Sequence, residues 1–314
     1  MKAIYYTEYG PAEVLQFGEQ PTPKIKSDQV LVRVRASSVN PVDWKVRDGS
    51  AKMMTDRIFP KIPGRDIAGE VAALGDEVTR FRIGDRVFGM PIGIGGANAE
   101  YAAVDATVLA FIPDNLSFEQ AAAVPLAALT ALQALHNHAK LLSGDRVLIN
   151  GASGGVGSMG VQLARALGAG EITGVCGPDN VELVRSLGAD RVINHKEHDF
   201  TKDISRYDII FDAVGKTNFI DSKASLRNGG RYVTTAPNPK DVALGMLAAS
   251  LSNKKMLAFM AKNRGADMSL IANWLRTDIL KPVIDKTFPL AETAEAHRYS
   301  EKGGAAGKIV LTVE

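Results

Sequence analysis

The hydrophobic and polar positions of the chain follow one pattern before residue 122 and a different pattern after it. Before it, apolar and polar residues alternate in short runs, clearly at residues 30–35 and less regularly at 69–74. Gly, Pro and Asp separate these runs at close intervals. Alternation with a period of two is typical of half-buried strands, and such punctuation is typical of turns. The first part is therefore predicted to form a compact, barrel-like β domain.

After residue 122, short apolar runs alternate with segments whose apolar residues have helical spacing. Strands are predicted at 146–149, 172–176, 191–193, 207–212 and 231–234, with helices at 156–167 and 180–187. Strands that alternate with helices are joined by right-handed crossovers and form a parallel, doubly wound sheet. A helix at 267–276 and a strand at 308–313 are predicted in the tail. An α/β fold is expected.

Composition narrows the function classes. The chain has 314 residues, 37 Lys and Arg against 35 Asp and Glu, and one cysteine, Cys176. The length predicts two domains, and a net charge of +2 gives no reason to expect binding to nucleic acid or to an anionic membrane. The most apolar stretch, 121–135, is interrupted by Pro125 and is too short to span a membrane. With no signal peptide and no disulfide, we expect a cytoplasmic protein.

A glycine-rich turn at 149–157 lies between a predicted strand and a predicted helix. Glycines there let the backbone approach a pyrophosphate, and the helix N-terminus offers free N–H groups. A second predicted strand ends about 20 residues later, as in dinucleotide-binding folds. The turn therefore predicts a dinucleotide site, and the alternative is a tight turn that binds nothing.

The end of the second strand bears on the choice of cofactor. An Asp or Glu there would hold the ribose 2′-OH of NAD, but this chain has Cys176 and Gly177. NADPH is therefore favoured. Asp179 follows closely, no Lys or Arg lies between Gly174 and Glu182, and NADH stays possible. His195, after the next strand, could reach the adenosine or be a surface histidine.

Several spaced motifs together resemble the medium-chain dehydrogenase/reductase superfamily. The segments 40–45 (NPVDWK), 63–69 (PGRDIAG), 129–135, 152–157 and 307–308 are similar to those of its zinc-independent quinone oxidoreductases, of the zeta-crystallin-like and chloroplast-envelope types. The resemblance implies a GroES-like β-barrel catalytic domain at 1–121 and 262–314. A Rossmann cofactor domain with a doubly wound parallel sheet would occupy 122–261, and the active site would lie in the cleft.

Zinc enzymes of this superfamily carry a Cys where Asn40 stands and a His where Arg65 stands, with further cysteines that this chain lacks. The pairs His136/His138 and His195/His198 complete no tetrahedral set. No metal is therefore expected. Without a Lewis acid, dehydrogenation of an alcohol is difficult, and hydride transfer from NADPH to a quinone or an α,β-unsaturated carbonyl (enone or alkenal) is favoured.

Lys45 is the first candidate to stabilise negative charge on the acceptor oxygen, and it stands where relatives often carry a Tyr near the nicotinamide. Asn40 and Thr130 could position the acceptor or the nicotinamide amide. Lys45 could instead be an exposed charge, and Asn40 a turn residue. Residues 49–52 offer no Tyr as a proton donor, which leaves water for that role.

The resemblance also implies a cofactor site along the strand ends. Its members would be Lys45, Ser153, Gly154, Gly155, Val156, Gly157, Gly177, Asn180, His195, Ala213, Val214, Gly215, Thr235, Ala236, Phe259, Met260, Ala261 and Lys308, with Lys308 toward the cofactor phosphates. Trp44, Phe88 and Met90 could line an apolar acceptor cleft, although each taken alone could be ordinary packing.

Two other functions stay open at this point. The chain could be a non-catalytic NADPH-binding protein, as the lens crystallins of this family are, or a zinc-free alcohol dehydrogenase. RNA binding, known among some relatives, is disfavoured by the absence of a basic stripe. A small-molecule substrate and a homodimer are expected, because relatives commonly pair.

Overall fold

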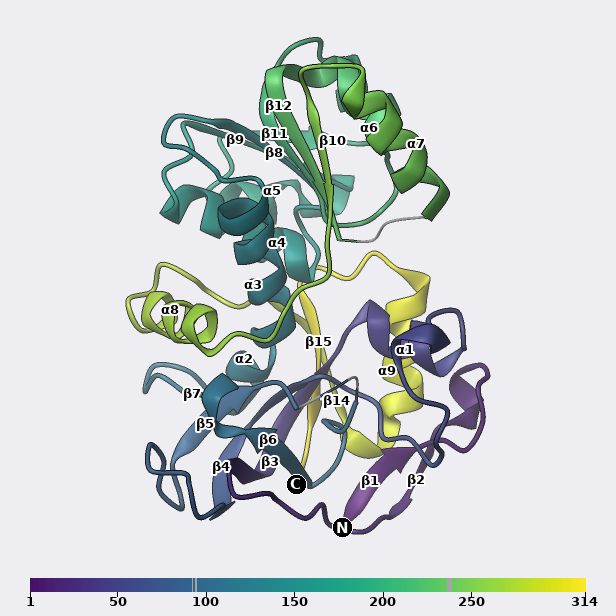
Figure 1. The fold of residues 1–314 in the computed structure, drawn as a ribbon, viewed down its shortest axis with the longest axis vertical. Coiled ribbons are helices and arrows are strands. Elements are labelled where there is room, and N and C mark those ends of the chain that lie inside the picture. The colour runs from purple at the N-terminus through teal and green to yellow at the C-terminus, as the bar shows by residue number, and fades with distance from the viewer. Residues whose placement is uncertain (92, 94, 236–238) are drawn as a thin grey trace. The chain divides into compact units, whose positions relative to one another are not determined.

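A computed structural model describes residues 1–314 apart from 92, 94 and 236–238, and Figure 1 shows its helices and strands. The chain divides into two units. The first comprises Met1–Leu126 and Asn263–Glu314, and the second comprises Ala127–Lys262. The domain boundaries expected from the sequence were 121 and 262.

The first unit is built on a seven-stranded sheet of order β14-β15-β3-β4-β5-β7, in which β6 also pairs with β3. Its strands are β3 (Gln29–Val39), β4 (Asp66–Leu74), β5 (Arg86–Gly89), β6 (Tyr101–Asp105), β7 (Ala110–Phe111), β14 (Ile284–Pro289) and β15 (Lys308–Thr312), beside a separate pair of β1 (Lys2–Tyr5) and β2 (Gln16–Glu19). Its helices are α1 (Pro41–Arg47), α2 (Phe118–Ala122), α8 (Gly265–Arg276) and α9 (Thr293–Lys302).

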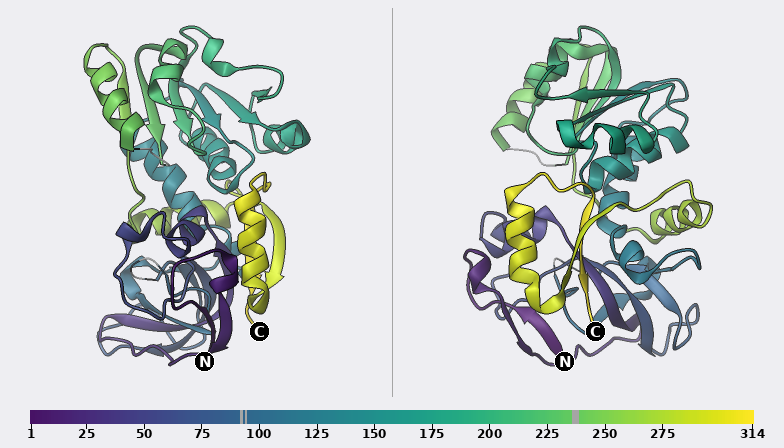
Figure 2. Two further views of the ribbon diagram at one scale, coloured as in Figure 1. Left: turned by 90° about the vertical axis from the view of Figure 1, so that its right-hand side faces the viewer. Right: turned by 180° about the vertical axis from the view of Figure 1, so that it is seen from behind.

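The C-terminal tail completes the N-terminal sheet. β15 pairs antiparallel with β3, and the register places Ile309 opposite Val39. Helix α9 lies against β14 and β15, as both views of Figure 2 show. Alternate residues of β3, including Val30, Val32 and Val34, are buried in the hydrophobic core of this unit. Strand periodicity therefore places the core on one face of the sheet.

The second unit contains a six-stranded sheet of order β10-β9-β8-β11-β12-β13, and every pair in it is parallel. Its elements are β8 (Arg146–Asn150), α4 (Gly155–Ala166), β9 (Glu171–Cys176), α5 (Val181–Ser186), β10 (Arg191–Asn194), β11 (Tyr207–Asp212), α6 (Phe219–Ser222), β12 (Leu226–Thr234), α7 (Pro239–Ser250) and β13 (Lys255–Ala258). Helices α4 and α5 cover one face of the sheet, and α6 and α7 cover the other (Figures 1 and 2). The predicted doubly wound α/β fold is confirmed.

Two details of this sheet differ from the sequence prediction. β12 begins at Leu226 rather than at 231, because Leu226 is buried and pairs with Tyr207 ahead of the two glycines that obscure the apolar pattern. The short edge strand β13 was not predicted. Its four residues are exposed or only half-buried, so their sequence carries no clear alternation.

Helix α3 (Pro125–Leu132) leads from the first unit into the second and continues as one turn of π-helix (Gln133–His138). The remaining short elements are 3₁₀ turns at Ala12–Val14, Lys52–Met54, Ala106–Val108, Pro178–Asn180, Phe200–Lys202, Lys223–Ser225 and Leu290–Glu292.

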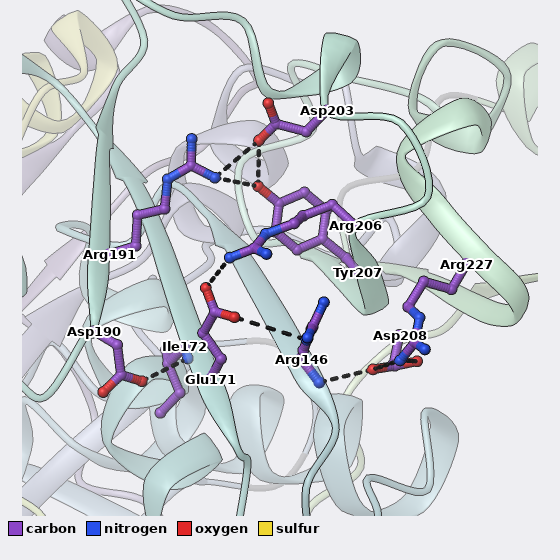
Figure 3. Close-up of polar contacts among 10 residues, drawn as sticks. All are labelled: Arg146, Glu171, Ile172, Asp190, Arg191, Asp203, Arg206, Tyr207, Asp208 and Arg227. Carbon is purple, nitrogen blue, oxygen red and sulfur yellow. Dashed lines mark hydrogen bonds and ion pairs between the residues drawn. The ribbon is translucent and has the colours of Figure 1, made fainter.

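Charged side chains join the amino-terminal ends of the parallel strands (Figure 3). Glu171, which begins β9, pairs with Arg206 and lies 3.8 Å from the Arg146 side chain at the start of β8. The Arg146 backbone N–H donates to Asp208 of β11 over 2.9 Å, and Asp208 pairs with Arg227 of β12 over 3.1 Å. These contacts tie four adjacent strands together at this edge.

Candidate functional site

The carboxyl-terminal edge of the parallel sheet is the part of the second unit suited to a nucleotide. The chain runs outward from β8 through β9 to β10, and then resumes on the other side of β8 with β11. In open parallel sheets, ligands bind outside the carboxyl ends of the strands at the point where the strand order reverses. Here that point lies between β8 and β11.

The glycine-rich turn after β8 has a backbone that only glycine fits at two positions. Gly151 has φ +81°, and a Cβ there would lie 1.9 Å from Cγ2 of Val214. A Cβ on Gly157 would lie 2.0 Å from the carbonyl oxygen of Gly151. The start of α4 therefore packs directly on the turn. The first N–H groups of this helix have no acceptor within the helix.

Asp212, the last residue of β11, organises the neighbouring turn and was not singled out from the sequence. Its fully buried carboxylate accepts hydrogen bonds from Asn150 Nδ2 at 3.0 Å and from the backbone N–H groups of Val214 at 3.2 Å and Gly215 at 3.1 Å. The Tyr232 hydroxyl donates to its other oxygen over 2.9 Å. Burial, followed by the charge of Asp212, raises the pKa of Tyr232.

The residues expected at the adenosine come together at the ends of β9 and β10. The His195 backbone N–H donates to the Cys176 carbonyl over 3.0 Å, and a Cβ on Gly177 would lie 3.7 Å from His195 Nε2. The Asn180 N–H donates to the Gly177 carbonyl over 3.2 Å. Asp179 is exposed at the start of the following turn.

The residues expected near the nicotinamide follow β12 and β13. Thr235 is half-buried, Met260 is 58% exposed, and Ala261 is half-buried, whereas Ala236 lies outside the described residues. Phe259 is buried and stacks on His138, with ring centroids 4.2 Å apart. Thr130 is buried in α3.

In the first unit, the residues expected at the acceptor lie on or next to α1. Asn40 is the N-cap of this helix and forms a capping box with Asp43, whose Oδ2 accepts the Asn40 N–H over 2.7 Å. Lys45 is half-buried, with its ammonium 5.4 Å from the centre of the Trp44 ring. The Trp44 indole N–H donates to Ser300 of α9 over 3.2 Å.

A cluster of buried polar groups lies at the N-terminal end of α1. Lys308 Nζ donates to Asn40 Oδ1 at 2.5 Å, to Asp66 Oδ2 at 3.1 Å and to the Val39 carbonyl at 3.3 Å. An ammonium has three hydrogens, so all of its donors have partners within the first unit. The expectation that Lys308 reaches the cofactor phosphates stays a prediction, and these contacts argue against it.

The same cluster binds both polar groups of the Asn40 side chain. Its Nδ2 donates to Asp66 Oδ2 over 2.8 Å, its Oδ1 accepts from Lys308, and the residue is 4% exposed. Both ends of the amide are thus bound inside the first unit. Direct contact of Asn40 with an acceptor stays a prediction, and the geometry favours the alternative interpretation, a residue that stabilises the turn.

Asp43 is a second buried acid beside this cluster. Burial raises its pKa to about 7, against the lowering effect of the Asn40 N–H, and the nearby Asp66 raises it further. Within the described part of the chain its Oδ1 has no hydrogen-bond partner. A small cavity of about 10 Å³ lies next to it, lined by Tyr6, Val46, Pro63, Gly64 and Gly95.

Phe88 and Met90 are fully buried in the first unit. The Met90 carbonyl accepts a hydrogen bond from Asn263 over 3.1 Å. This burial is what ordinary packing would give, and their place in an acceptor cleft stays a prediction.

The turns of the carboxyl edge were thus predicted from the sequence, but the structural roles of Asp66 and Asp212 were not. Each acid lies at one end of a strand with apolar neighbours, a position where burial is costly unless hydrogen bonds satisfy the carboxylate. That signal was present, but all side-chain partners of both acids are distant in the sequence.

No three His, Cys, Asp or Glu side chains lie where they could hold a metal ion, as far as the described residues show. In the same part of the chain, no helix is long and apolar enough to cross a membrane.

Comparison with known proteins gives consistent matches. Residues 26–114 match the alcohol dehydrogenase GroES-like domain, and 187–311 match a family described as zinc-binding dehydrogenase. The chain is 34% identical to the chloroplastic quinone-oxidoreductase homolog of Spinacia oleracea (99% of this chain, 98% of that protein) and 35% identical to the quinone oxidoreductase of Homo sapiens (99% and 97%). It is 34% identical to the chloroplastic NADPH-dependent alkenal/one oxidoreductase of Arabidopsis thaliana (99% and 79%).

Solved structures agree with these matches. The quinone oxidoreductase from Coxiella burnetii has a TM-score of 0.92 at 33% identity, with 100% of this chain and 99% of that chain covered. A mycobacterial protein complexed with NADPH has a TM-score of 0.86 at 27% identity, with 100% of both chains covered.

Proposed function

Because the chain belongs to the medium-chain dehydrogenase/reductase superfamily and, within it, to the quinone oxidoreductases, we propose that it is an NADPH-dependent reductase of quinones or α,β-unsaturated carbonyls. The observation that carries the proposal is the carboxyl edge of the parallel sheet, where Gly151 and Gly157 let the start of α4 pack closely on the turn after β8. A helix N-terminus at this position is suited to a pyrophosphate. Relatives named for NADPH support that cofactor.

Bound NADPH supplies the hydride in this chemistry, and the protein supplies binding, orientation and electrostatics. We assign the pyrophosphate to the turn of residues 153–157, and the adenosine to Gly177, Asn180 and His195. The turn at 213–215, Thr235 and the segment 259–261 follow the remaining strands and complete the proposed cofactor site, to which Ala236 is also assigned. The first backbone N–H groups of α4 bind the negative charge of the pyrophosphate, because helix N-termini favour anions.

Lys45 is proposed to stabilise the negative charge that develops on the acceptor oxygen. A fixed cation lowers the energy of such a transition state when it is held in place before the reaction. Stacking of the Lys45 ammonium over Trp44 restricts the side chain in this way. Thr130 is retained as a proposed positioning residue. Water would supply the proton that completes the reduction of the acceptor, because residues 49–52 offer no Tyr for that role.

The direct test is oxidation of NADPH, followed by the loss of its nicotinamide absorbance. An ortho-quinone, a medium-chain 2-alkenal and a blank without acceptor would be compared, with NADH as the second cofactor. We expect turnover of at least one acceptor with NADPH. Tight binding of NADPH without oxidation of any acceptor would contradict the proposal and favour the non-catalytic alternative.

Replacement of Lys45 tests its proposed role. Lys45→Ala should lower kcat/KM for the acceptor roughly 100-fold, because it removes one fixed charge from the transition state. Lys45→Arg, which keeps the positive charge, should retain much of the activity. Equal rates for Lys45→Ala and the parent protein would show that Lys45 is part of the scaffold only.

We also propose a homodimer that is located in the cytoplasm. Among the described residues, strand β13 is at the edge of the parallel sheet and pairs only with β12. Such an edge can accept a strand from another chain. The single, buried, free Cys176 suits a reducing compartment. Light scattering would test the dimer, which should have twice the 33.5 kDa mass of the chain.

A further inference from the structure

Asp66 joins four separate segments of the first unit through its carboxylate. The residue has no exposed surface. Its Oδ2 accepts from Ser38 Oγ at 2.6 Å, Asn40 Nδ2 at 2.8 Å and Lys308 Nζ at 3.1 Å, and its Oδ1 accepts from the Leu126 backbone N–H at 2.8 Å. One buried charge therefore holds β3, the start of α1, the first turn of α3 and the start of β15.

We propose that the buried pair of Asp66 and Lys308 is the positioning device for α1, the helix that carries Lys45. Asn40 caps this helix, and both ends of its amide are bound by the pair. Lys45 follows one turn later on the same short helix, so the direction of its side chain depends on how the first turn is fixed. As a device for acceptor reduction, the pair rests on the function proposed above.

The cost of burying two charges favours a positional role of the pair over a contribution to stability. Burial of two charges is costly, and replacing a buried ion pair by neutral groups is often neutral or stabilising, whereas removal of one partner is strongly destabilising. Lys308 is 4% exposed and Asp66 is not exposed, so the pair gains little from solvent. It does fix β3, the start of α1 and the first turn of α3 in one geometry.

The test uses Trp44 as a reporter on α1. The chain has two tryptophans, and Trp274→Phe leaves Trp44 as the single emitter. In that background we would compare Lys308→Met, Asp66→Asn and the double variant, with Ser37→Ala as the matched control. Ser37 also lies on β3 and donates a buried 2.7 Å hydrogen bond to Asn98, but this bond does not involve the pair.

The double variant is the decisive test, because it buries no unpaired charge. It can therefore be measured even if the single variants fail to fold. It should unfold near the parent temperature, shift the emission of Trp44 to longer wavelength and lower kcat for the acceptor about 10- to 100-fold. Its dissociation constant for NADPH should be that of the parent protein. Ser37→Ala should change neither the emission nor kcat.

Two outcomes would overturn the proposal. A folded double variant with unchanged Trp44 emission would show that α1 keeps its place without the pair. A weaker affinity for NADPH in Lys308→Met than in Asp66→Asn would assign Lys308 to the cofactor phosphates instead. Both measurements are independent of turnover, so a parent protein that reduces no acceptor would refute the proposed reductase function and leave this test intact.

Discussion

The two edges of the parallel sheet in residues 127–262 are built in opposite ways. At the carboxyl edge, glycine turns pack on α4, and buried Asp212 receives hydrogen bonds from neutral donors. At the amino edge, the same strands begin with charged side chains joined in ion pairs, of which Arg206 with Glu171 and Arg227 with Asp208 are examples (Figure 3).

This difference fits the cofactor site that we propose at the carboxyl edge. An edge that binds a dinucleotide must keep backbone N–H groups open and allow close approach, which bulky charged side chains would prevent. The opposite edge has no such demand, and half-exposed ion pairs can tie its strands at little cost. Substitutions at the carboxyl edge should therefore change binding strongly, and those at the amino edge should change stability but leave binding unaltered.

The largest expected effect is that of Gly157→Ala. The new Cβ would lie 2.0 Å from the Gly151 carbonyl oxygen, so the turn or the helix must shift. If about 3 kcal/mol of strain enters the binding step, the affinity for NADPH falls roughly 100-fold. Fluorescence titration with NADPH measures this loss.

Gly154→Ala is the matched control for the fold, since its Cβ would lie 3.6 Å from the Gly151 carbonyl oxygen, an ordinary contact. It should unfold at the temperature of the parent protein. Equal NADPH affinity of Gly157→Ala and the parent would contradict the assignment of the pyrophosphate to this turn.

Asp212→Ala should have the next largest effect. The substitution leaves the Asn150 side-chain amide and the backbone N–H groups of Val214 and Gly215 without this acceptor, whereas the Tyr232 hydroxyl keeps the Thr217 carbonyl as an acceptor. The free energy of unfolding should fall by about 3 kcal/mol, and NADPH should bind more weakly because the 213–215 turn loses its shape. Urea unfolding and NADPH titration measure the two effects. A stable variant with normal affinity would remove Asp212 from the site.

Asp203→Asn tests the amino edge through pH. Burial alone would raise the pKa of Asp203, but hydrogen bonds from Tyr207 and His198 and the charge of Arg191 hold it below its usual range. A lowered pKa means that the carboxylate stabilises the fold above its unfolded pKa, and that this contribution is lost as the pH falls through the folded value.

The parent protein should therefore exceed Asp203→Asn in unfolding free energy by about 2 kcal/mol at neutral pH. The difference should shrink steadily on acidification below the ordinary pKa of an Asp. Urea unfolding at several pH values would show this trend, and a difference independent of pH would refute it. NADPH affinity should stay that of the parent protein at neutral pH.

Arg227→Ala should have the smallest effect. The Arg227 side chain is 49% exposed, and its pair with Asp208 is therefore largely screened by water. The unfolding free energy should fall by less than about 1 kcal/mol, and NADPH affinity should not change. A loss of NADPH affinity here would contradict the separation of roles between the two edges.

Elements with a clear local pattern could be predicted from the sequence, and the others could not. Strands 207–212 and 308–313 and the helix after the glycine turn could be predicted, because their periodicity is local and Gly151 marks the turn between β8 and α4. The strand β13 could not, since its side chains are mostly exposed and show no alternation. Lys308 was placed at the cofactor phosphates by resemblance, whereas the structure bonds it to Asn40 and Asp66.

The sequence by itself determined the α/β class, the order of the elements and the glycine turn, because these depend on residues close together in the chain. Only the tertiary structure decided which buried charges meet. Asp66 and Lys308 are 242 positions apart, and nothing in their local sequence encodes the partner of either. A buried charge takes whichever opposite charge the packed sheets bring within reach, so its partner becomes known only when the fold is complete.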